Sequence, residues 1–207
     1  MITTRPLAGL IAASLLLSGC VSIGGGGEPP ESLLTLTASA SAPAGSGAVS
    51  GVEGSEGAIA VLTPEVPAKL NVIRVPVTVS ATEIAYLPEA VWIEKPAHLF
   101  RKLLGETLRT ASGEPQALLV LDTDDTPLRA TQSLRGTLID MGYEAANSAV
   151  VVRFEAVHTN SDGKVMSRRF EAREEGVLPT AASVGPALNT AANAVAKDVA
   201  AWVKSSQ

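Results

Sequence analysis

The sequence contains very few cysteines and aromatic residues. Its 207 residues include one cysteine, which excludes an internal disulfide and a cysteine-rich metal site. Aromatic residues make up only 3% of a chain that is 46% hydrophobic, so a core must consist mainly of Val, Leu, Ile and Ala. The net charge of −5 argues against a nucleic-acid partner, because neutralising phosphates requires clustered Lys and Arg. The length allows one domain with a tail.

The single cysteine lies directly behind an apolar segment. Residues 1–5 form a weakly basic start, and the apolar run over residues 7–17 is too short for a bilayer, which needs about 20 apolar residues. This arrangement is typical of a secretory signal peptide. The run ends in Leu17-Ser18-Gly19-Cys20, the pattern of a bacterial lipobox, in which small side chains fit a narrow protease pocket and the thiol accepts diacylglycerol. The sequence therefore predicts a signal peptide over residues 1–19 and a lipid anchor on Cys20.

The residues after the cysteine predict a tether and a location. Residues 20–32 contain four consecutive glycines, which add no side chains to a core, so we expect a lipidated, flexible tether. The residue after Cys20 is Val21 rather than Asp, which favours the outer membrane by the sorting rule of enteric bacteria. We therefore expect a lipid-anchored protein of the cell envelope, on the periplasmic face of the outer membrane, with one domain over residues 33–207.

The patterns along this domain predict an α+β fold. Strands are expected over 33–37, 58–62, 71–80 and 117–121, and three antiparallel strands over 134–143, 149–159 and 164–173. Pro76 indicates an edge strand or a bulge. Helices are expected over 96–111 and 181–204, each with an apolar stripe that we expect to face the sheet, although Trp202 could instead face a partner. The predicted architecture is a mainly antiparallel sheet, packed by a central helix and a long C-terminal helix, in a single domain.

One segment resembles a catalytic motif. Asp122-Thr123-Asp124 follows an apolar strand, as in haloacid-dehalogenase-type phosphatases, where Asp122 would be the nucleophile and Asp124 the acid/base beside Mg²⁺. The rest of that site is missing, because Asp140 and Asp162 lie apart and form no paired motif. A polar loop at a strand end is the favoured interpretation, so we predict no enzyme activity and no catalytic residue.

Histidines and arginines give no further catalytic or metal site. The two histidines, His98 and His158, are far apart and have no cysteine partners, so no metal or cofactor is expected. Four arginines gather on the last predicted strands. We expect them to pair with Glu155 and Glu171 on solvated strand faces; the alternative is a contact surface for an acidic partner or a phospholipid headgroup. These arginines are Arg153, Arg168, Arg169 and Arg173.

Several short segments, taken in order, resemble one family. They are Arg-Val-Pro-Val at 74–77, Ile-Ala-Tyr-Leu at 84–87, Trp-Ile-Glu-Lys-Pro at 92–96, Asp-Gly-Lys-Val at 162–165, Arg-Arg-Phe-Glu-Ala at 168–172, Ala-Leu-Asn-Thr-Ala-Ala-Asn at 187–193 and Val-Ala-Ala-Trp-Val at 199–203. With the lipobox in front of them, the chain resembles the ABC-type transport auxiliary lipoproteins, the PqiC/YmbA-like family associated with Mce-type lipid transport systems.

The resemblance implies a non-enzymatic auxiliary component of a transport system that moves phospholipid between the inner and outer membranes. Its expected partners are an Mce-domain protein with an inner-membrane permease and ATPase, and a homo-oligomer would suit docking to a ring-forming Mce protein. Two alternatives stay open. One is a structural or assembly lipoprotein of the cell envelope, and the other is a phosphatase that uses Asp122 and Asp124.

Overall fold

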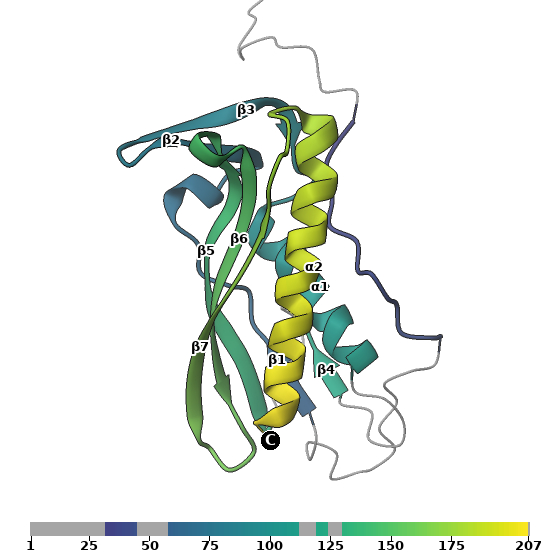
Figure 1. Ribbon diagram of the computed structural model, residues 1–207. Coiled ribbons are helices and arrows are strands. Elements are labelled where there is room, and N and C mark those ends of the chain that lie inside the picture. Colours follow the sequence, from purple (N-terminus) through teal and green to yellow (C-terminus); the bar gives the residue numbers. More distant parts are fainter. Residues whose placement is uncertain (1–31, 45–57, 112–118, 124–129, 207) are drawn as a thin grey trace, which may run out of the picture.

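The computed structural model describes residues 32–44, 58–111, 119–123 and 130–206. These residues form a seven-stranded sheet and two α-helices (Figure 1). The strands are β1 (Ala58–Val61), β2 (Arg74–Ser80), β3 (Glu83–Val91), β4 (Leu119–Leu121), β5 (Gln132–Glu144), β6 (Ala149–Thr159) and β7 (Val165–Glu174). The helices are α1 (Pro96–Ala111) and α2 (Ala181–Ser205), with short 3-10 turns η1 (Ala68–Leu70) and η2 (Ala145–Asn147).

The sheet is built around the long strand β5. One edge of β5 pairs with β6, which in turn pairs with β7, and both pairings are antiparallel. The other edge of β5 pairs in parallel with β1 near its start and with β2 near its end. Between these two pairings, Glu65 forms a parallel bridge to Thr137. The chain from residue 58 to residue 78 therefore runs parallel to β5. Strand β5 is therefore hydrogen-bonded on both edges over most of its length.

The prediction of an α+β domain is confirmed, but the prediction of a mainly antiparallel sheet is wrong. The sheet is mixed, because β1–β4, β1–β5 and β2–β5 pair in parallel, whereas β2–β3, β5–β6 and β6–β7 pair antiparallel. A parallel pair needs a long crossover between its strands, and helix α1 lies on the connection from β1 to β4. Alternation within a strand reports which side chains are buried but not which strand it pairs with, so the parallel half was missed.

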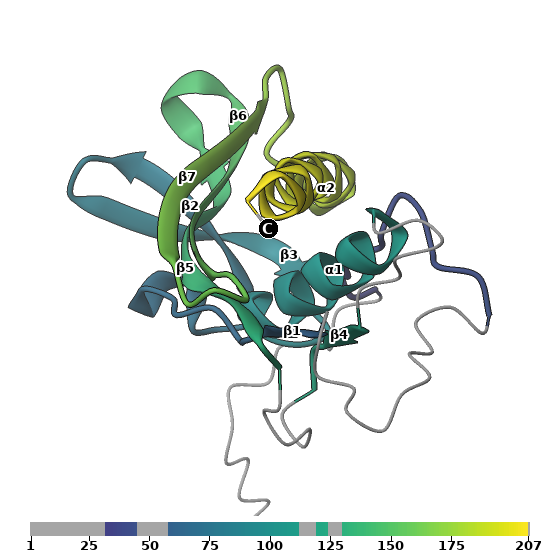
Figure 2. The same ribbon diagram turned by 90° about the horizontal axis from the view of Figure 1, so that it is seen from below.

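Both helices lie on the same side of the curved sheet, which wraps around them (Figure 2). The single hydrophobic core lies between the sheet and the helices. Helix α1 buries Leu99, Leu103, Leu104 and Leu108, the stripe expected from the sequence. Thr180 caps the start of helix α2, since its side chain accepts a hydrogen bond from Ser183 N, and the apolar stripe of α2 is also buried. No helix in the described part of the chain is long and apolar enough to cross a membrane.

Two other segments differ from the expected strands. Residues 33–37 form only one isolated bridge, between Leu34 and Trp92, rather than a strand. Strand β3 was not predicted, because Pro88 and several polar residues interrupt its alternation; it pairs with β2 across a wide bulge between the pairs Arg74–Val91 and Pro76–Tyr86. Glu89 lies in this bulge with a φ of 60°. Pro76 was expected to mark an edge strand or a bulge. Strand β2 is not an edge strand, because it lies between β3 and β5, and the register shift next to Pro76 confirms the bulge.

Candidate functional site

An extended N-terminal segment lies across both helices, and we call residues 33–42 the strap. Leu34, Leu36 and Ala38 are partly buried and pack against the core, whereas the residues between them are exposed. The strap passes beside α2 towards α1 (Figure 1). The strap is the part of the chain that directly follows the predicted tether, residues 20–32.

Two asparagines of α2 bind the backbone of the strap. Thr37 N donates to Asn189 Oδ1 at 2.8 Å, and Ser39 N donates to Asn193 Oδ1 at 2.7 Å. Asn193 Nδ2 donates in return to Thr37 O at 2.9 Å, and also to Asn189 O at 2.8 Å. An amide side chain offers both an acceptor and donors, so Asn193 satisfies the strap backbone as a neighbouring strand would.

The two ends of the strap are fixed by different elements. At its start, Leu34 N donates to Val91 O at 2.7 Å, and the Leu34 side chain lies against Gly185 of α2. A Cβ added at Gly185 would lie 2.7 Å from Leu34 Cδ2, so the close approach depends on glycine. At its other end, Ala42 N donates to Glu106 Oε1 of α1 at 2.7 Å. The strap is therefore joined to β3, α2 and α1.

The strap was not predicted, although the sequence carries a signal for it. Asn189 and Asn193 lie one helical turn apart, so both side chains project from the same face of α2. Asn193 is buried although it is polar. Two amides at this spacing, at the border of an apolar stripe, indicate a site for extended backbone. Cys20, the predicted lipid anchor, lies outside the described residues.

Asp122 is held by an arginine of α1. Arg109 Nη2 donates to Asp122 Oδ1 at 2.6 Å and to Val120 O at 3.4 Å, and only 13% of the Asp122 side chain is exposed. Burial lowers the pKa of Arg109, but its bonds to Asp122 and Glu106 outweigh this and raise the pKa overall. Asp124 lies outside the described residues. The structure therefore places Asp122 in an ion pair that joins β4 to α1.

The two histidines lie in different surroundings. His98 is half exposed on α1, with Nδ1 3.9 Å from Glu94 Oε2. His158 is fully buried on β6, with Nδ1 3.0 Å from Ser206 Oγ and Nε2 3.2 Å from Gln132 Oε1. Burial lowers the pKa of His158, which favours the neutral ring. Trp202 packs against His158 and Phe170 rather than facing a partner.

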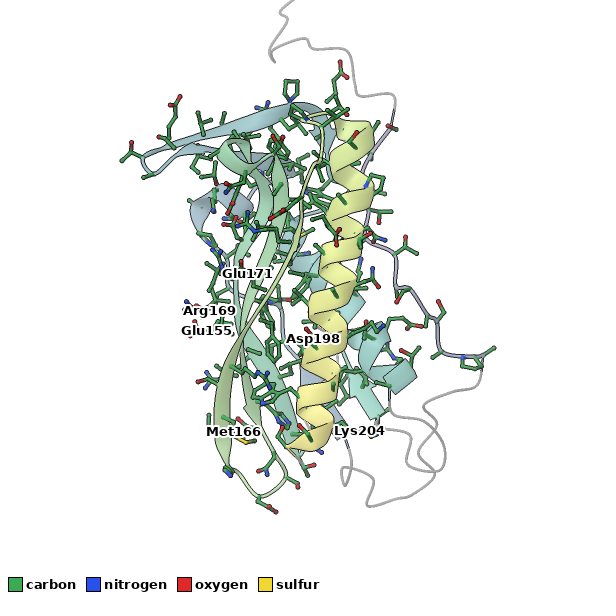
Figure 3. The ribbon with its side chains drawn as sticks, in the orientation of Figure 1. Glu155, Met166, Arg169, Glu171, Asp198 and Lys204 are labelled. Carbon is green, nitrogen blue, oxygen red and sulfur yellow. The ribbon has the colours of Figure 1, made fainter. Side chains whose placement is uncertain are left out.

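Three of the four arginines on β6 and β7 pair with carboxylates, and two of them, Arg153 and Arg169, pair with the expected Glu171 and Glu155. Arg153 Nε donates to Glu171 Oε2 at 2.6 Å, a hydrogen bond that lowers the pKa of Glu171, and Arg169 Nη2 lies 2.5 Å from Glu155 Oε2. Glu155, Arg169 and Glu171 lie on the sheet face away from α2 (Figure 3). Arg173 Nη1 lies 2.8 Å from Glu144 Oε2, whereas Arg168 lies over the ring of Phe170, 5.2 Å from its centroid. The opposite charges alternate, so this face is not a purely basic surface.

The described residues contain no group of His, Cys, Asp and Glu that could hold a metal ion. What the chain does display is a segment bound by amide side chains and a face of alternating charges.

Solved structures share this fold. Protein XCC0632 from Xanthomonas campestris, described with the family model DUF330, matches with a TM-score of 0.64 and 14% identity, over 83% of this chain and 94% of that one. A crystal structure titled as an uncharacterized protein matches with a TM-score of 0.59 and 16% identity, over 72% of this chain and 92% of that one. At these identities the likeness shows the fold alone.

A weaker likeness extends to the PelC dodecamer from Paraburkholderia phytofirmans. Its TM-score is 0.39 and its identity 14%, over 69% of this chain and 85% of that one, which is too little to support an argument about assembly. No family model matches the chain, and no curated protein matches its sequence.

The family expected from the sequence is therefore corrected. No model matches the chain, and its structural neighbours are described as a DUF330 protein and an uncharacterized protein rather than as ABC-type transport auxiliary lipoproteins. At least one matched segment reflects local structure. Residues 162–165, for example, form a hairpin turn in which Gly163 has a φ of 78°, a conformation that many unrelated hairpins share.

Proposed function

We propose that this chain is a non-enzymatic docking module, anchored by lipid to the periplasmic face of the outer membrane. In this proposal it serves an Mce/ABC-type system that moves phospholipid between the inner and outer membranes. Its partners are an Mce-domain protein with its inner-membrane permease and ATPase. The observation that carries the proposal is the lipobox ending at Cys20, followed by a strap that is bound to both helices.

The strap supports the anchoring part of the proposal. A domain held by one lipidated residue must transmit any pull on that residue into its core. Here the segment nearest to Cys20 is joined to α2 through Asn189 and Asn193, and to α1 through Glu106. A force applied to the strap is therefore carried by both helices together rather than by one strand alone.

The surroundings of Asp122 support the non-enzymatic part of the proposal. A nucleophilic carboxylate needs open access to its substrate, whereas Asp122 is mostly buried and accepts a charge-assisted hydrogen bond from Arg109. Magnesium-dependent hydrolysis of a generic phosphomonoester, lost in Asp122→Asn, would contradict this part.

Crosslinking in the native host tests the proposed partners. The tagged, membrane-anchored protein is captured after crosslinking and its partners are identified by mass spectrometry, beside a Cys20→Ser variant that cannot be acylated. Recovery of an Mce-domain protein, its permease or its ATPase, reduced in Cys20→Ser, is the expected result. Recovery of cell-wall or outer-membrane assembly proteins alone would overturn the transport role and favour a structural lipoprotein.

A further inference from the structure

Four exposed apolar side chains surround the start of the strap, and we call them the end patch. They are Leu33, Val72, Ile73 and Ile93, with exposed fractions of 49%, 36%, 45% and 60%. The segments that carry them are joined by backbone hydrogen bonds, since Ile93 N donates to Leu34 O at 2.9 Å and Trp92 N donates to Ile73 O at 2.7 Å. The end patch therefore comes from three neighbouring parts of the chain that are hydrogen-bonded to one another.

A grouped apolar surface of this kind needs an occupant. Single exposed apolar residues are common on proteins, but adjacent ones mark contact sites for proteins or membranes. Two cations, Arg74 and Lys95, lie beside the patch in sequence and are exposed. Arg74 lies over the Tyr86 ring and Lys95 Nζ donates to Asn71 Oδ1, and neither pairs with a carboxylate in the described part of the chain. Apolar side chains flanked by exposed cations suit the interface of a phospholipid bilayer.

The short stretch of sequence between Cys20 and the patch indicates which membrane the patch would contact, namely the one that holds the lipid anchor. Cys20 precedes Ser32 by 12 residues, a length that spans at most about 40 Å when fully extended. The strap begins at the end of the molecule where α2 begins (Figure 1). An acylated Cys20 therefore keeps the start of the strap within about 40 Å of the membrane, and this linkage raises the effective concentration of the membrane at the patch, so that even a weak apolar contact is favoured.

We propose that the end patch rests on the surface of the membrane that holds the lipid anchor, so that the domain stands on the bilayer with the β6–β7 hairpin pointing away from it. This inference depends on the acylation in the proposed function. Met166 lies at the opposite end of the molecule from the start of the strap (Figure 3), and Val165 beside it is 59% exposed. Val165 is thus a matched control for Ile93, being equally exposed and at the far end.

Fluorescence at single labelled sites tests the orientation. Ile93→Cys, Ile73→Cys and Val165→Cys are introduced one at a time into the full lipidated chain, labelled with an environment-sensitive fluorophore, and reconstituted in vesicles of phosphatidylethanolamine and phosphatidylglycerol. The thiol of an acylated Cys20 cannot react, so the wild-type chain is expected to take no label. Labelling of the wild-type chain would show that acylation has failed, which is a failure of the proposed function rather than of the orientation.

The expected result is a several-fold rise in fluorescence at positions 73 and 93 on adding vesicles, quenched by a nitroxide carried on the lipid, with no change at position 165. Equal, unquenched signals at positions 93 and 165 in an acylated chain would overturn the inference. A signal at position 93 that depends on protein concentration and not on vesicles would also overturn it, because a second copy would then cover the patch.

A second measurement does not depend on the label. In a Cys20→Ser background, weak sedimentation with the same vesicles is expected to be lost on Ile93→Glu and kept on Val165→Glu. Loss of sedimentation to the same extent in both variants would contradict a patch-specific contact.

Discussion

At the scale of single residues, His158 links the end of α2 to the start of β5. Its two ring nitrogens lie near Ser206 and Gln132, and burial keeps its pKa below the value of a free histidine. The folded state therefore binds the proton less readily than the unfolded chain, whose histidine titrates near 6.5. The contribution of His158 to stability is thus present above that pH and is lost as the pH falls below it.

We expect the free energy of unfolding to fall between about pH 7 and pH 5.5, by at most ~1.4 kcal/mol per pH unit for this one proton. Urea denaturation at several pH values measures the slope. His158→Gln is expected to flatten the slope, whatever it does to the stability itself. His98→Gln removes the half-exposed histidine and serves as control; a slope that follows His98 instead would refute the assignment.

Gly105 is a second residue whose role follows from a contact. A Cβ added there would overlap the carboxylate of Asp122, which the Arg109 ion pair holds against α1. We expect Gly105→Ala to destabilise the protein by about 1–3 kcal/mol, despite the higher helix propensity of alanine. A double-mutant cycle in urea checks the cause, because Gly105→Ala should cost clearly less when Asp122→Ala has removed the carboxylate. Equal costs in both backgrounds would place the strain elsewhere.

At the scale of elements, the strap depends on one amide. Asn193→Ala leaves Ser39 N and Thr37 O without their partners, so we expect a loss of about 1–3 kcal/mol and faster hydrogen exchange over residues 36–42. Asn189→Ala removes one bond at a more exposed site and should have a smaller effect. Hydrogen exchange followed by mass spectrometry measures both. Unchanged protection of the strap in Asn193→Ala would show that Leu34 and Leu36 hold it without the amides.

Elements with strong local patterns were predictable, and elements set by distant contacts were not. Helix α1 has the predicted bounds, because Pro96 and the leucine stripe both act locally. The β6–β7 hairpin was likewise predicted from its turn and alternation. The strap is different, because its amide partners are about 150 residues away, and so is the parallel pairing of β1 with β5. The candidate site was missed for the same reason, since its signal is two asparagines rather than a motif.

At the scale of the whole molecule, one core joins both ends. Trp92 is buried near the start of the strap, and Trp202 packs against His158 near the C-terminus. Because a single hydrophobic cluster includes the surroundings of both, we expect one cooperative unfolding transition. Trp202→Phe leaves Trp92 as the only tryptophan, and the urea midpoint of its fluorescence should match that of far-ultraviolet circular dichroism on the same variant. Separate midpoints would show that the strap end unfolds on its own.

The strap is among the first described segments to be synthesised, and its partners are among the last. Thr37 and Ser39 bond to side chains that follow them by 152 and 154 residues. Because the ribosome makes the chain from its N-terminus, the strap has no binding site until α2 is complete. Residues 37 and 39 therefore stay unbound by α2 until the chain is nearly complete, and formation of the last helix is the event that fixes the strap. Timing is thus built into the topology: the strap is made first and is held in place last.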